Sequence, residues 1–315
     1  MNKSTKIFVA GHNGMVGSAI VRSLHAKGFS EIMTADRKKL DLSDAAAVES
    51  FFSKHSFEVV YNAAAKVGGI VGNANNPSDY ILENLIIQNN IASACLKTRV
   101  DRYIFLGSCC IYPKNCPQPM REEYLLSGPL EATNEPYAVA KIAGIVTSRG
   151  LSSQYGLKTV TPMPINLYGP GDNWDPINSH IIPGLMRRLH FAKSEGLPST
   201  EVWGSGLVRR EYMHVDDCAD GIIFISDKFD HGEIINIAPG TELTTRETAM
   251  EIAEIVGYKG ELIQNLSKPD GTPRKLASSE IMAGLGWTPN IGFSEGLEDT
   301  YREFLKSIGS GRGLK

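Results

Sequence analysis

Residues 7–17 have the sequence Ile7-Phe8-Val9-Ala10-Gly11-His12-Asn13-Gly14-Met15-Val16-Gly17. The apolar start of this stretch predicts a buried strand, and the periodic residues 18–24 that follow predict a helix. The glycines between them allow a tight turn with close backbone approach, and the N-terminus of a helix attracts a pyrophosphate. The spacing G-x-x-G-x-x-G differs from the standard G-x-G-x-x-G, so a plain strand-to-helix turn remains an alternative. We predict a dinucleotide-binding turn after the first strand of a sheet.

The first half of the chain alternates strand and helix signals, a pattern typical of a parallel sheet with helices on both faces. Further strands are expected at 31–35, 57–61, 103–107, 158–162 and 234–238, and helices near 44–54, 78–98, 137–155, 215–226, 245–256 and 294–307. We predict an α/β fold: a Rossmann-type doubly wound parallel sheet with a smaller, mostly C-terminal α/β substrate-binding domain. The expected nucleotide domain spans 1–165 plus about 213–240, and the substrate domain spans 166–212 and 241–315.

The composition is that of an ordinary globular enzyme, with 42% hydrophobic and 21% charged residues among 315. The net charge of −3 gives no reason to expect nucleic acid or an anionic membrane as a partner. Five cysteines without a disulfide-like framework favour a reducing compartment, and no Cys/His spacing is typical of a metal site. The chain runs directly into a strand and has no apolar run of membrane-spanning length, so we expect a cytoplasmic protein without a metal.

Tyr137 and Lys141 lie four residues apart in a predicted helix, and therefore on one helix face. A neighbouring ammonium favours the phenolate and lowers the pKa of a tyrosine, as acid/base catalysis requires. Ser108 follows the predicted strand 103–107, at the edge where open α/β sheets bind ligands. Any amphipathic helix can carry Tyr and Lys at this spacing, so the pair alone is weak evidence.

Longer sequence segments make the functional prediction more specific. They include Ala63-Ala64-Ala65-Lys66-Val67-Gly68-Gly69-Ile70, Leu106-Gly107-Ser108-Cys109-Cys110-Ile111-Tyr112-Pro113, Asn134-Glu135-Pro136-Tyr137-Ala138-Val139-Ala140-Lys141, Asn178-Ser179-His180 and Lys268-Pro269-Asp270-Gly271-Thr272-Pro273-Arg274-Lys275. With these strings the chain resembles the extended short-chain dehydrogenases/reductases. More narrowly, it resembles the GDP-L-fucose synthase family, the 3,5-epimerase/4-reductases that act on GDP-4-keto-6-deoxy-D-mannose.

This resemblance implies two kinds of chemistry. In the reduction, a nicotinamide hydride reaches C4 of the sugar while Tyr137 protonates the oxygen, Ser108 donates a hydrogen bond to it and Lys141 holds the ribose. In the epimerisation, Cys110 is the implied base and His180 the implied acid, with a neighbouring imidazolium able to acidify the thiol. The alternatives are a small buried cysteine and an exposed loop histidine. Cys109 is expected to be structural, because successive side chains after a strand point apart.

The resemblance also implies the binding residues. The GDP-sugar is expected to contact Arg188, Trp203, Arg210, Lys268 and Asp270. Arg187 remains an alternative to Arg188, and a core position remains an alternative for Trp203. The expected cofactor-binding residues are Gly11, Asn13, Gly14, Met15, Val16, Gly17, Asp36, Arg37, Asp41, Leu42, Ala64, Tyr137, Lys141, Pro164, Asn166, Leu167 and His180.

The choice between NADPH and NADH rests on opposed signals. Asp36 ends the predicted second strand, where an acidic residue usually binds free ribose hydroxyls and repels a 2′-phosphate. The bacterial members of the family carry an arginine where this chain has Asn13. Arg37, Lys38 and Lys39 favour a 2′-phosphate instead. We expect NADP(H), as the resemblance implies, with NAD(H) as the alternative.

Two other functions are compatible with the sequence. One is a related epimerase or reductase acting on another GDP-4-keto sugar, of the colitose or heptose type. The other is a non-catalytic dinucleotide-binding protein, which the retention of Ser108, Tyr137 and Lys141 disfavours. The resemblance further implies a homodimer, through the helices expected at 78–98 and 137–155.

Overall fold

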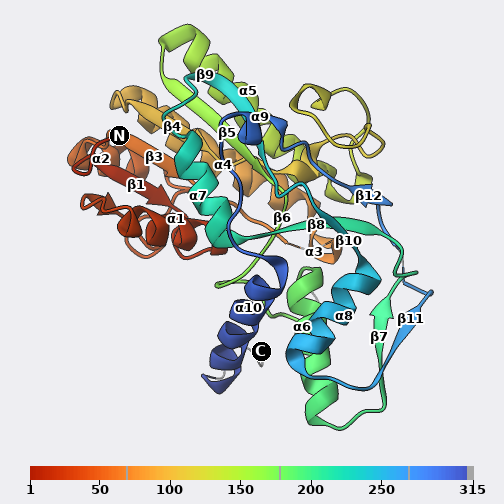
Figure 1. Ribbon diagram of the computed structural model, residues 1–315. Helices are drawn as coiled ribbons and strands as arrows, with labels where there is room; N and C mark the ends of the chain where they lie inside the picture. Colours follow the sequence, from red (N-terminus) through yellow and green to blue (C-terminus); the bar gives the residue numbers. More distant parts are fainter. Residues whose placement is uncertain (69, 177–178, 269, 311–315) are drawn as a thin grey trace.

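The computed structural model describes residues 1–68, 70–176, 179–268 and 270–310. Its larger part is built on a six-stranded sheet in which every neighbouring pair of strands is parallel (Figure 1). The strand order is β2 (Ile32–Met33), β1 (Ile7–Ala10), β3 (Val59–Asn62), β4 (Arg102–Phe105), β5 (Lys158–Pro164) and β9 (His231–Ile237). Because the strands are parallel, their carboxyl ends meet at one edge, where ligands bind in open α/β sheets.

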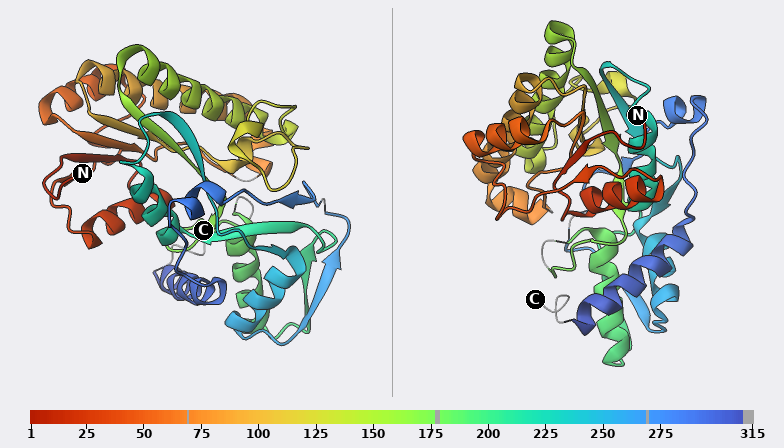
Figure 2. Two further views of the ribbon diagram at one scale, coloured as in Figure 1. Left: turned by 45° about the horizontal axis from the view of Figure 1, so that its top comes forward. Right: turned by 90° about the vertical axis from the view of Figure 1, so that its left-hand side faces the viewer.

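Helices cover both faces of this sheet, as the doubly wound prediction requires (Figure 2). On one face α1 (Met15–Ala26) packs against α7 (Val215–Ile225). On the other, α4 (Pro77–Lys97) packs against both α2 (Ala45–His55) and α5 (Glu135–Tyr155). Short helices occupy the loops at the carboxyl edge: α3 (Ile70–Asn75) and the 3₁₀ turns η1 (Cys109–Ile111), η2 (Glu122–Tyr124) and η3 (Ala132–Asn134).

The smaller part is also α/β. Strand β8 (Arg209–His214) is its centre, pairing with β6 (Asn166–Tyr168), β10 (Glu242–Thr244) and β12 (Arg274–Lys275). A separate parallel pair joins β7 (Ser199–Trp203) to β11 (Glu261–Asn265). The helices here are α6 (Ile181–Ser194), α8 (Thr245–Val256) and α10 (Phe293–Gly309), whereas α9 (Glu280–Gly284) packs against β9 of the larger sheet.

The buried apolar residues form two clusters. One fills the space around the six-stranded sheet, and the other joins α6, α8 and α10 to β8. Ala277, Met282 and Trp287 belong to the first cluster, although they fall within the range predicted for the substrate domain. Contacts of Trp287 hold this C-terminal segment against the six-stranded sheet. The Trp287 indole lies against Gly221 of α7 and donates a hydrogen bond to Asp220 Oδ2 at 2.8 Å.

Most predicted elements are present with shifted ends. Helix α8 has the predicted bounds, because Thr244 and Glu247 form a reciprocal capping box at its start. Strand β2 has two residues instead of five, since the chain leaves the sheet for a turn at Asp36. Strand β5 extends through Pro162 to Pro164. Beyond Val160 it pairs only with β9, so these prolines interrupt no ladder to β4.

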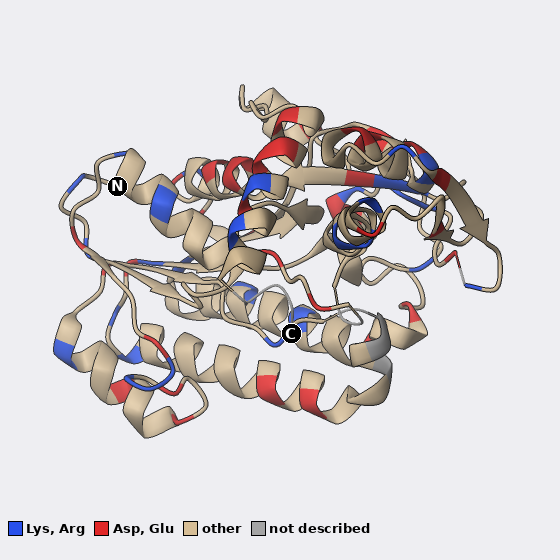
Figure 3. Cartoon of the chain, turned by 90° about the horizontal axis from the view of Figure 1, so that it is seen from below, with Lys and Arg blue, Asp and Glu red and all other residues tan. Residues whose placement is uncertain are grey.

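Acidic and basic residues are interspersed over the molecule (Figure 3). Among the described residues, none of the helices has the length and apolar character needed to cross a membrane. The same residues contain no group of three or more His, Cys, Asp or Glu side chains placed to hold a metal ion.

Candidate active site

The glycine turn brings three segments of backbone together at the carboxyl edge of the sheet. Gly11 has a φ of 78°, and a Cβ there would lie 2.7 Å from the backbone of Ala63 and Ala64. A Cβ on Gly17 would lie 2.2 Å from Gly11 O. Gly14 occupies the N-cap of α1 and, having no side chain, leaves the first-turn amides without a side-chain cap. The backbone N–H groups from Met15 onward therefore suit the binding of the negatively charged oxygens of a pyrophosphate.

We expect Gly17→Ala to lower the free energy of unfolding by about 3 kcal/mol, because the clash is with backbone that cannot rotate away. Gly14→Ala is the matched control. Its Cβ would meet Gly11 O at 3.4 Å, and the φ of −80° suits alanine, so its cost stays below about 1 kcal/mol. Urea unfolding of the three proteins measures both values. Equal midpoints for the two variants would contradict the packing account of the turn.

The turn after β2 holds the residues expected to select the cofactor. Asp36 Oδ1 accepts a hydrogen bond from the Lys39 amide at 3.0 Å, so this carboxylate is engaged within its own turn. Arg37 is 81% exposed, with Nε 3.5 Å from Asp41 Oδ2. Hydrogen bonds from Ser43 hold the pKa of Asp41 below its ordinary value. Leu42 is fixed through its carbonyl, which accepts from Asn90 Nδ2 at 3.0 Å. Arg37, paired with Asp41, is therefore exposed at the surface of this turn together with Lys38 and Lys39.

Ser108, Tyr137 and Lys141 come together at the end of β4. Ser108 Oγ accepts the Cys110 amide at 3.2 Å and is hydrogen-bonded to the Tyr137 phenol. Lys141 is 4% exposed, and its Nζ donates to Leu106 O at 2.7 Å. Helix α5 approaches the strand closely because it carries Gly144, where a Cβ would lie 2.2 Å from the Phe105 ring. The predicted triad is thus one cluster.

The charge state of this triad differs from the sequence prediction. Burial raises the pKa of Tyr137, whereas the ammonium of Lys141 was expected to lower it. Lys141 Nζ is 6.0 Å from the centroid of the Tyr137 ring and is directed at a carbonyl oxygen instead. Burial also lowers the pKa of Lys141 to about 8. The phenol is therefore protonated at neutral pH, which is the state that a proton donor needs.

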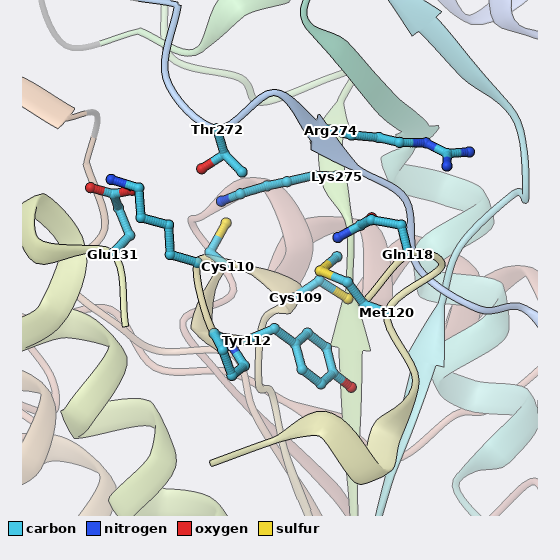
Figure 4. A pocket seen from close by; sticks show the side chains of 11 residues that line it. Cys109, Cys110, Tyr112, Gln118, Met120, Glu131, Thr272, Arg274 and Lys275 are labelled. Atoms are coloured by element: carbon cyan, nitrogen blue, oxygen red, sulfur yellow. The ribbon is translucent and has the colours of Figure 1, made fainter. Parts of the chain in front are cut away.

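Cys109 and Cys110 have different surroundings. Cys109 is buried, its Sγ donates to Met163 O at 3.0 Å, and burial raises the pKa of its thiol, so its expected structural role is confirmed. Cys110 is half-buried and lines a small pocket (Figure 4). Its sulfur faces the amine end of Lys275, from β12. The thiol of Cys110 also contributes to the raised pKa of Tyr137, which puts the two side chains within electrostatic reach.

His180 occupies the N-cap of α6, and its side chain is exposed. Desolvation by the surrounding chain nevertheless lowers the pKa of its imidazole, which favours the neutral ring. Within the described residues, no hydrogen bond or ion pair joins His180 to Cys110. The imidazolium expected to acidify this thiol is therefore disfavoured. Asn178, quoted in the same string, lies outside the described residues.

Three of the five expected substrate residues form one stack. The Arg188 guanidinium carbon lies 4.7 Å from the centroid of the Trp203 ring, and Lys268 Nζ lies 5.1 Å from it. Trp203 is 47% exposed, so the core alternative for this indole is wrong. Arg187 contacts Trp174 O and the Phe191 ring instead, which leaves Arg188 as the arginine beside Trp203.

Asp270 and Arg210 border this stack. Asp270 Oδ1 accepts the Ser205 amide at 2.7 Å and lies against Gly204, whose φ of 79° and missing Cβ make room for the carboxylate. Arg210 is 8% exposed and donates to Arg209 O at 2.8 Å. Burial lowers the pKa of Arg210, while Cys110 and Asp270 act in the opposite direction. Arg210 therefore lies between the stack and the Cys110 pocket.

Known proteins match this chain along nearly its whole length. Residues 7–238 match the model of the NAD dependent epimerase/dehydratase family. GDP-L-fucose synthase 1 of Arabidopsis thaliana is 50% identical, with 98% of this chain and 95% of that protein covered. GDP-L-fucose synthase of Escherichia coli (strain K12) is 46% identical, with 98% and 99% covered. This chain belongs to the GDP-L-fucose synthase family. It is therefore an enzyme.

Other similar proteins include enzymes named for other GDP-sugars and solved structures. GDP-L-colitose synthase of Yersinia pseudotuberculosis is 35% identical, with 95% of this chain and 98% of that protein covered. Among solved structures, a GDP-6-OMe-4-keto-L-xylo-heptose reductase from C. jejuni has a TM-score of 0.91 at 33% identity, covering 98% and 99%. A GDP-L-fucose synthetase from Naegleria fowleri bound to NADP has a TM-score of 0.88 at 27% identity, covering 99% and 96%.

The remaining expected cofactor residues lie at or just beyond the carboxyl edge of the six-stranded sheet. Asn166 Nδ2 donates to Glu211 O at 2.9 Å, so this side chain holds β6 to β8. Pro164 ends β5, and Leu167 follows in β6. The Ala64 amide is bound by Asn62 Oδ1 at 3.3 Å, and Asn13 is exposed in the glycine turn.

Sequence reasoning missed two buried polar residues that hold the site together. The carboxylate of Glu211 accepts two backbone hydrogen bonds, from the Gly240 amide at 2.6 Å and from the Ala277 amide at 2.8 Å. Burial raises the pKa of Glu211 to about 7. Asn236 Oδ1 accepts the Tyr112 hydroxyl at 2.8 Å, and its Nδ2 donates to Met120 O at 2.9 Å.

Proposed function

We propose that this enzyme converts GDP-4-keto-6-deoxy-D-mannose to GDP-L-fucose, by epimerisation at C3 and C5 and NADPH-dependent reduction at C4. The observation that carries the proposal is the hydrogen bond from the Cys110 amide to Ser108 Oγ at 3.2 Å, which places Cys110 beside the cluster of Ser108, Tyr137 and Lys141. A base for proton exchange and an acid for reduction thus share one site. The membership of the chain in the family supplies the substrate.

In the reduction, a bound nicotinamide supplies the hydride that C4 receives. Tyr137 donates its proton to the C4 oxygen, and the raised pKa of the phenol keeps that proton available at neutral pH. Ser108 donates a hydrogen bond to the same oxygen as negative charge develops there. Lys141 fixes the helix to the end of β4 through Leu106 O and, through its remaining donors, binds the ribose hydroxyls.

In the epimerisation, the C4 ketone acidifies the protons on C3 and C5. Cys110, as thiolate, removes each proton, and Ser108 and Tyr137 donate hydrogen bonds to the resulting enolate oxygen. In the fraction of enzyme whose His180 ring is protonated, this imidazolium returns a proton to the opposite face of the carbon, and its lowered pKa favours the release of that proton. Arg188 and Lys268, the two cations beside the Trp203 ring, bind the nucleotide diphosphate together with Arg210. Asp270 lies beside them and contacts the sugar nucleotide.

NADP(H) is the proposed cofactor. Arg37 is exposed and Asp36 is engaged in its own turn, which favours a 2′-phosphate over free hydroxyls. The Naegleria fowleri structure bound to NADP supports the same choice. We expect kcat/KM for NADPH to exceed that for NADH by about tenfold, and Arg37→Gln to remove most of this preference. Parallel steady-state assays with both cofactors measure it. A preference for NADH in the native enzyme would contradict the assignment.

A cytoplasmic homodimer is also proposed. Leu82 and Ile86 of α4 and Val139 and Val146 of α5 are exposed apolar side chains with helical spacing. Two copies of this face would form a four-helix contact that removes them from water. Light scattering is expected to give twice the chain mass of 34.3 kDa. The free cysteines, of which Cys95, Cys109 and Cys218 are buried, support a reducing compartment, and the net charge of −3 favours neither nucleic acid nor membrane as partner.

The test is to supply GDP-4-keto-6-deoxy-D-mannose with NADPH and identify the product sugar by NMR. GDP-L-fucose is the expected product. A colitose-type or heptose-type relative is the second candidate, and the lower identity to the colitose synthase, 35% against 46–50%, disfavours it. Turnover of only those other keto sugars would overturn the proposed substrate. No turnover of any of them would show that the substrate of the enzyme lies outside these GDP-4-keto sugars.

A further inference from the structure

We propose that Lys275 stabilises the thiolate of Cys110, and so prepares the base that exchanges the sugar protons. The role of Lys275 in sugar epimerisation rests on the function proposed above. A thiol removes a carbon-bound proton only as thiolate, and a neighbouring cation favours that form. Sequence reasoning assigned this cation to an imidazolium, but the lowered pKa of His180 favours a neutral ring.

The position of Lys275 follows from strand pairing. In the parallel pair β8 and β12, Lys275 is in register with Arg210, and residues in register present their side chains to the same face of a sheet. Arg210 is the cation whose pKa responds to Cys110, so this face looks toward the thiol. In the pocket itself, the amine end of Lys275 points toward the sulfur of Cys110 (Figure 4).

The other cations of the pocket have partners. Lys114 Nζ lies 3.0 Å from Glu131 Oε2, so these two charges largely offset one another. Arg274 Nε lies 2.8 Å from Glu242 Oε2, and its side chain extends away from Cys110 (Figure 4). Lys275 has no carboxylate partner among the residues that the structure describes. Its ammonium is therefore available to the thiols around it; it also acts to lower the pKa of Cys109 and of Cys116, against the burial that raises both.

The other groups that line the pocket are uncharged. Two carboxyl groups, Glu122 and Glu211, act on the adjacent Cys109, and burial raises the pKa of both, which favours their neutral forms. Burial raises the pKa of Tyr112, of Tyr137 and of the Cys109 thiol, so all three are neutral at pH 7. With Glu131 paired to Lys114, Lys275 is the pocket-lining cation without a carboxylate partner among the described residues, and Arg210 is in register with it in the adjacent strand. Such a field favours the thiolate over the thiol.

Hydrogen bonds hold the lysine strand to the loop that carries the cysteine. The Met120 amide donates to Leu276 O at 2.7 Å, and the Ser278 amide donates to Met120 O at 2.8 Å. Gln118 Oε1 accepts the Leu276 amide at 2.8 Å. These bonds run between residues 118–120, which follow Cys110, and residues 276–278, which follow Lys275. The strand that carries Lys275 is therefore held against the loop that follows Cys110.

The test is the pH dependence of iodoacetamide alkylation at Cys110, followed residue by residue by tandem mass spectrometry in the full-length enzyme without substrate. Lys275→Met removes the charge, and Lys275→Arg restores it. Arg274→Met is the matched control, because it removes one positive charge from the adjacent residue of the same strand. We expect Lys275→Met to slow alkylation at pH 7 about tenfold and to move the half-maximal pH upward by about one unit. The Lys275→Arg and Arg274→Met profiles are expected to stay near the native one.

Two results would overturn the proposal. One is an unchanged profile in Lys275→Met, even if KM for the sugar nucleotide rises, since Lys275 would then serve the substrate alone. The other is an equal shift in Lys275→Met and Arg274→Met, which would reflect net charge and not position. Because no sugar is present, the outcome does not depend on whether the enzyme makes GDP-L-fucose, and the product assay tests that separately.

Discussion

Tyr137→Phe is expected to lower kcat for NADPH-dependent reduction by about 1,000-fold, because the phenol is the only donor assigned to give its proton to the C4 oxygen. The raised pKa of Tyr137 keeps it protonated at neutral pH, and phenylalanine fills the same volume without a proton to give. Exchange of solvent deuterium into C3 and C5 is expected to fall by much less. Ser108 still donates to the enolate oxygen, and Cys110 remains the base. NADPH oxidation and NMR of the sugar in D₂O measure the two processes in one sample.

The matched control for this variant is Tyr155→Phe, at the far end of the same helix. That phenol is 56% exposed and lies outside the site, so both rates are expected to stay near the native values. A Tyr137→Phe enzyme that oxidises NADPH within tenfold of the native rate would remove this residue from the mechanism.

Cys110→Ser is expected to lower deuterium exchange at C3 and C5 by about 1,000-fold, because an alcohol ionises far less readily than a thiol and supplies little base at neutral pH. The keto sugar is then reduced without inversion, so the product keeps its original configuration at both carbons. Tyr137 and Ser108 are untouched, and the reduction of C4 continues at a measurable rate.

Cys116→Ser is the comparison for this variant. Cys116 is a half-buried free cysteine in the loop that follows Cys110, and burial raises the pKa of its thiol. Its replacement is expected to leave exchange and reduction unchanged. Deuterium exchange at the native rate in Cys110→Ser would show that another group is the base, and that the Cys110 pocket has a different use.

The sequence predicted those parts of the fold and site that depend on local pattern. The strand–glycine turn–helix of residues 7–26 is present because each of its steps, an apolar run, permissive glycines and helical periodicity, acts over a few residues. The clustering of Ser108, Tyr137 and Lys141 follows from a strand end and one helix face. The choice of Arg188 over Arg187 required the structure, since adjacent helix residues differ only in the direction they face.

Features that arise from tertiary packing were beyond the sequence. The pKa of Tyr137 is raised because the phenol is buried. The spacing of Tyr137 and Lys141 in the sequence indicates that a lysine is near, but not how deeply the phenol is buried. Lys275 is 165 residues from Cys110 in the chain, and the register of β12 with β8 brings it to the pocket. Glu211 likewise binds two amides from distant segments, at Gly240 and Ala277.

The central claim is that one site holds the proton donor for reduction beside the base for epimerisation. Its most direct measurement is a crystal structure of the enzyme with NADP⁺ and GDP-L-fucose. We predict the sugar O4 within hydrogen-bond distance of the Tyr137 hydroxyl and Ser108 Oγ, with the sulfur of Cys110 facing C3 or C5 of the ring. A sugar bound with O4 away from Tyr137, or with Cys110 separated from the ring by other side chains, would contradict the account.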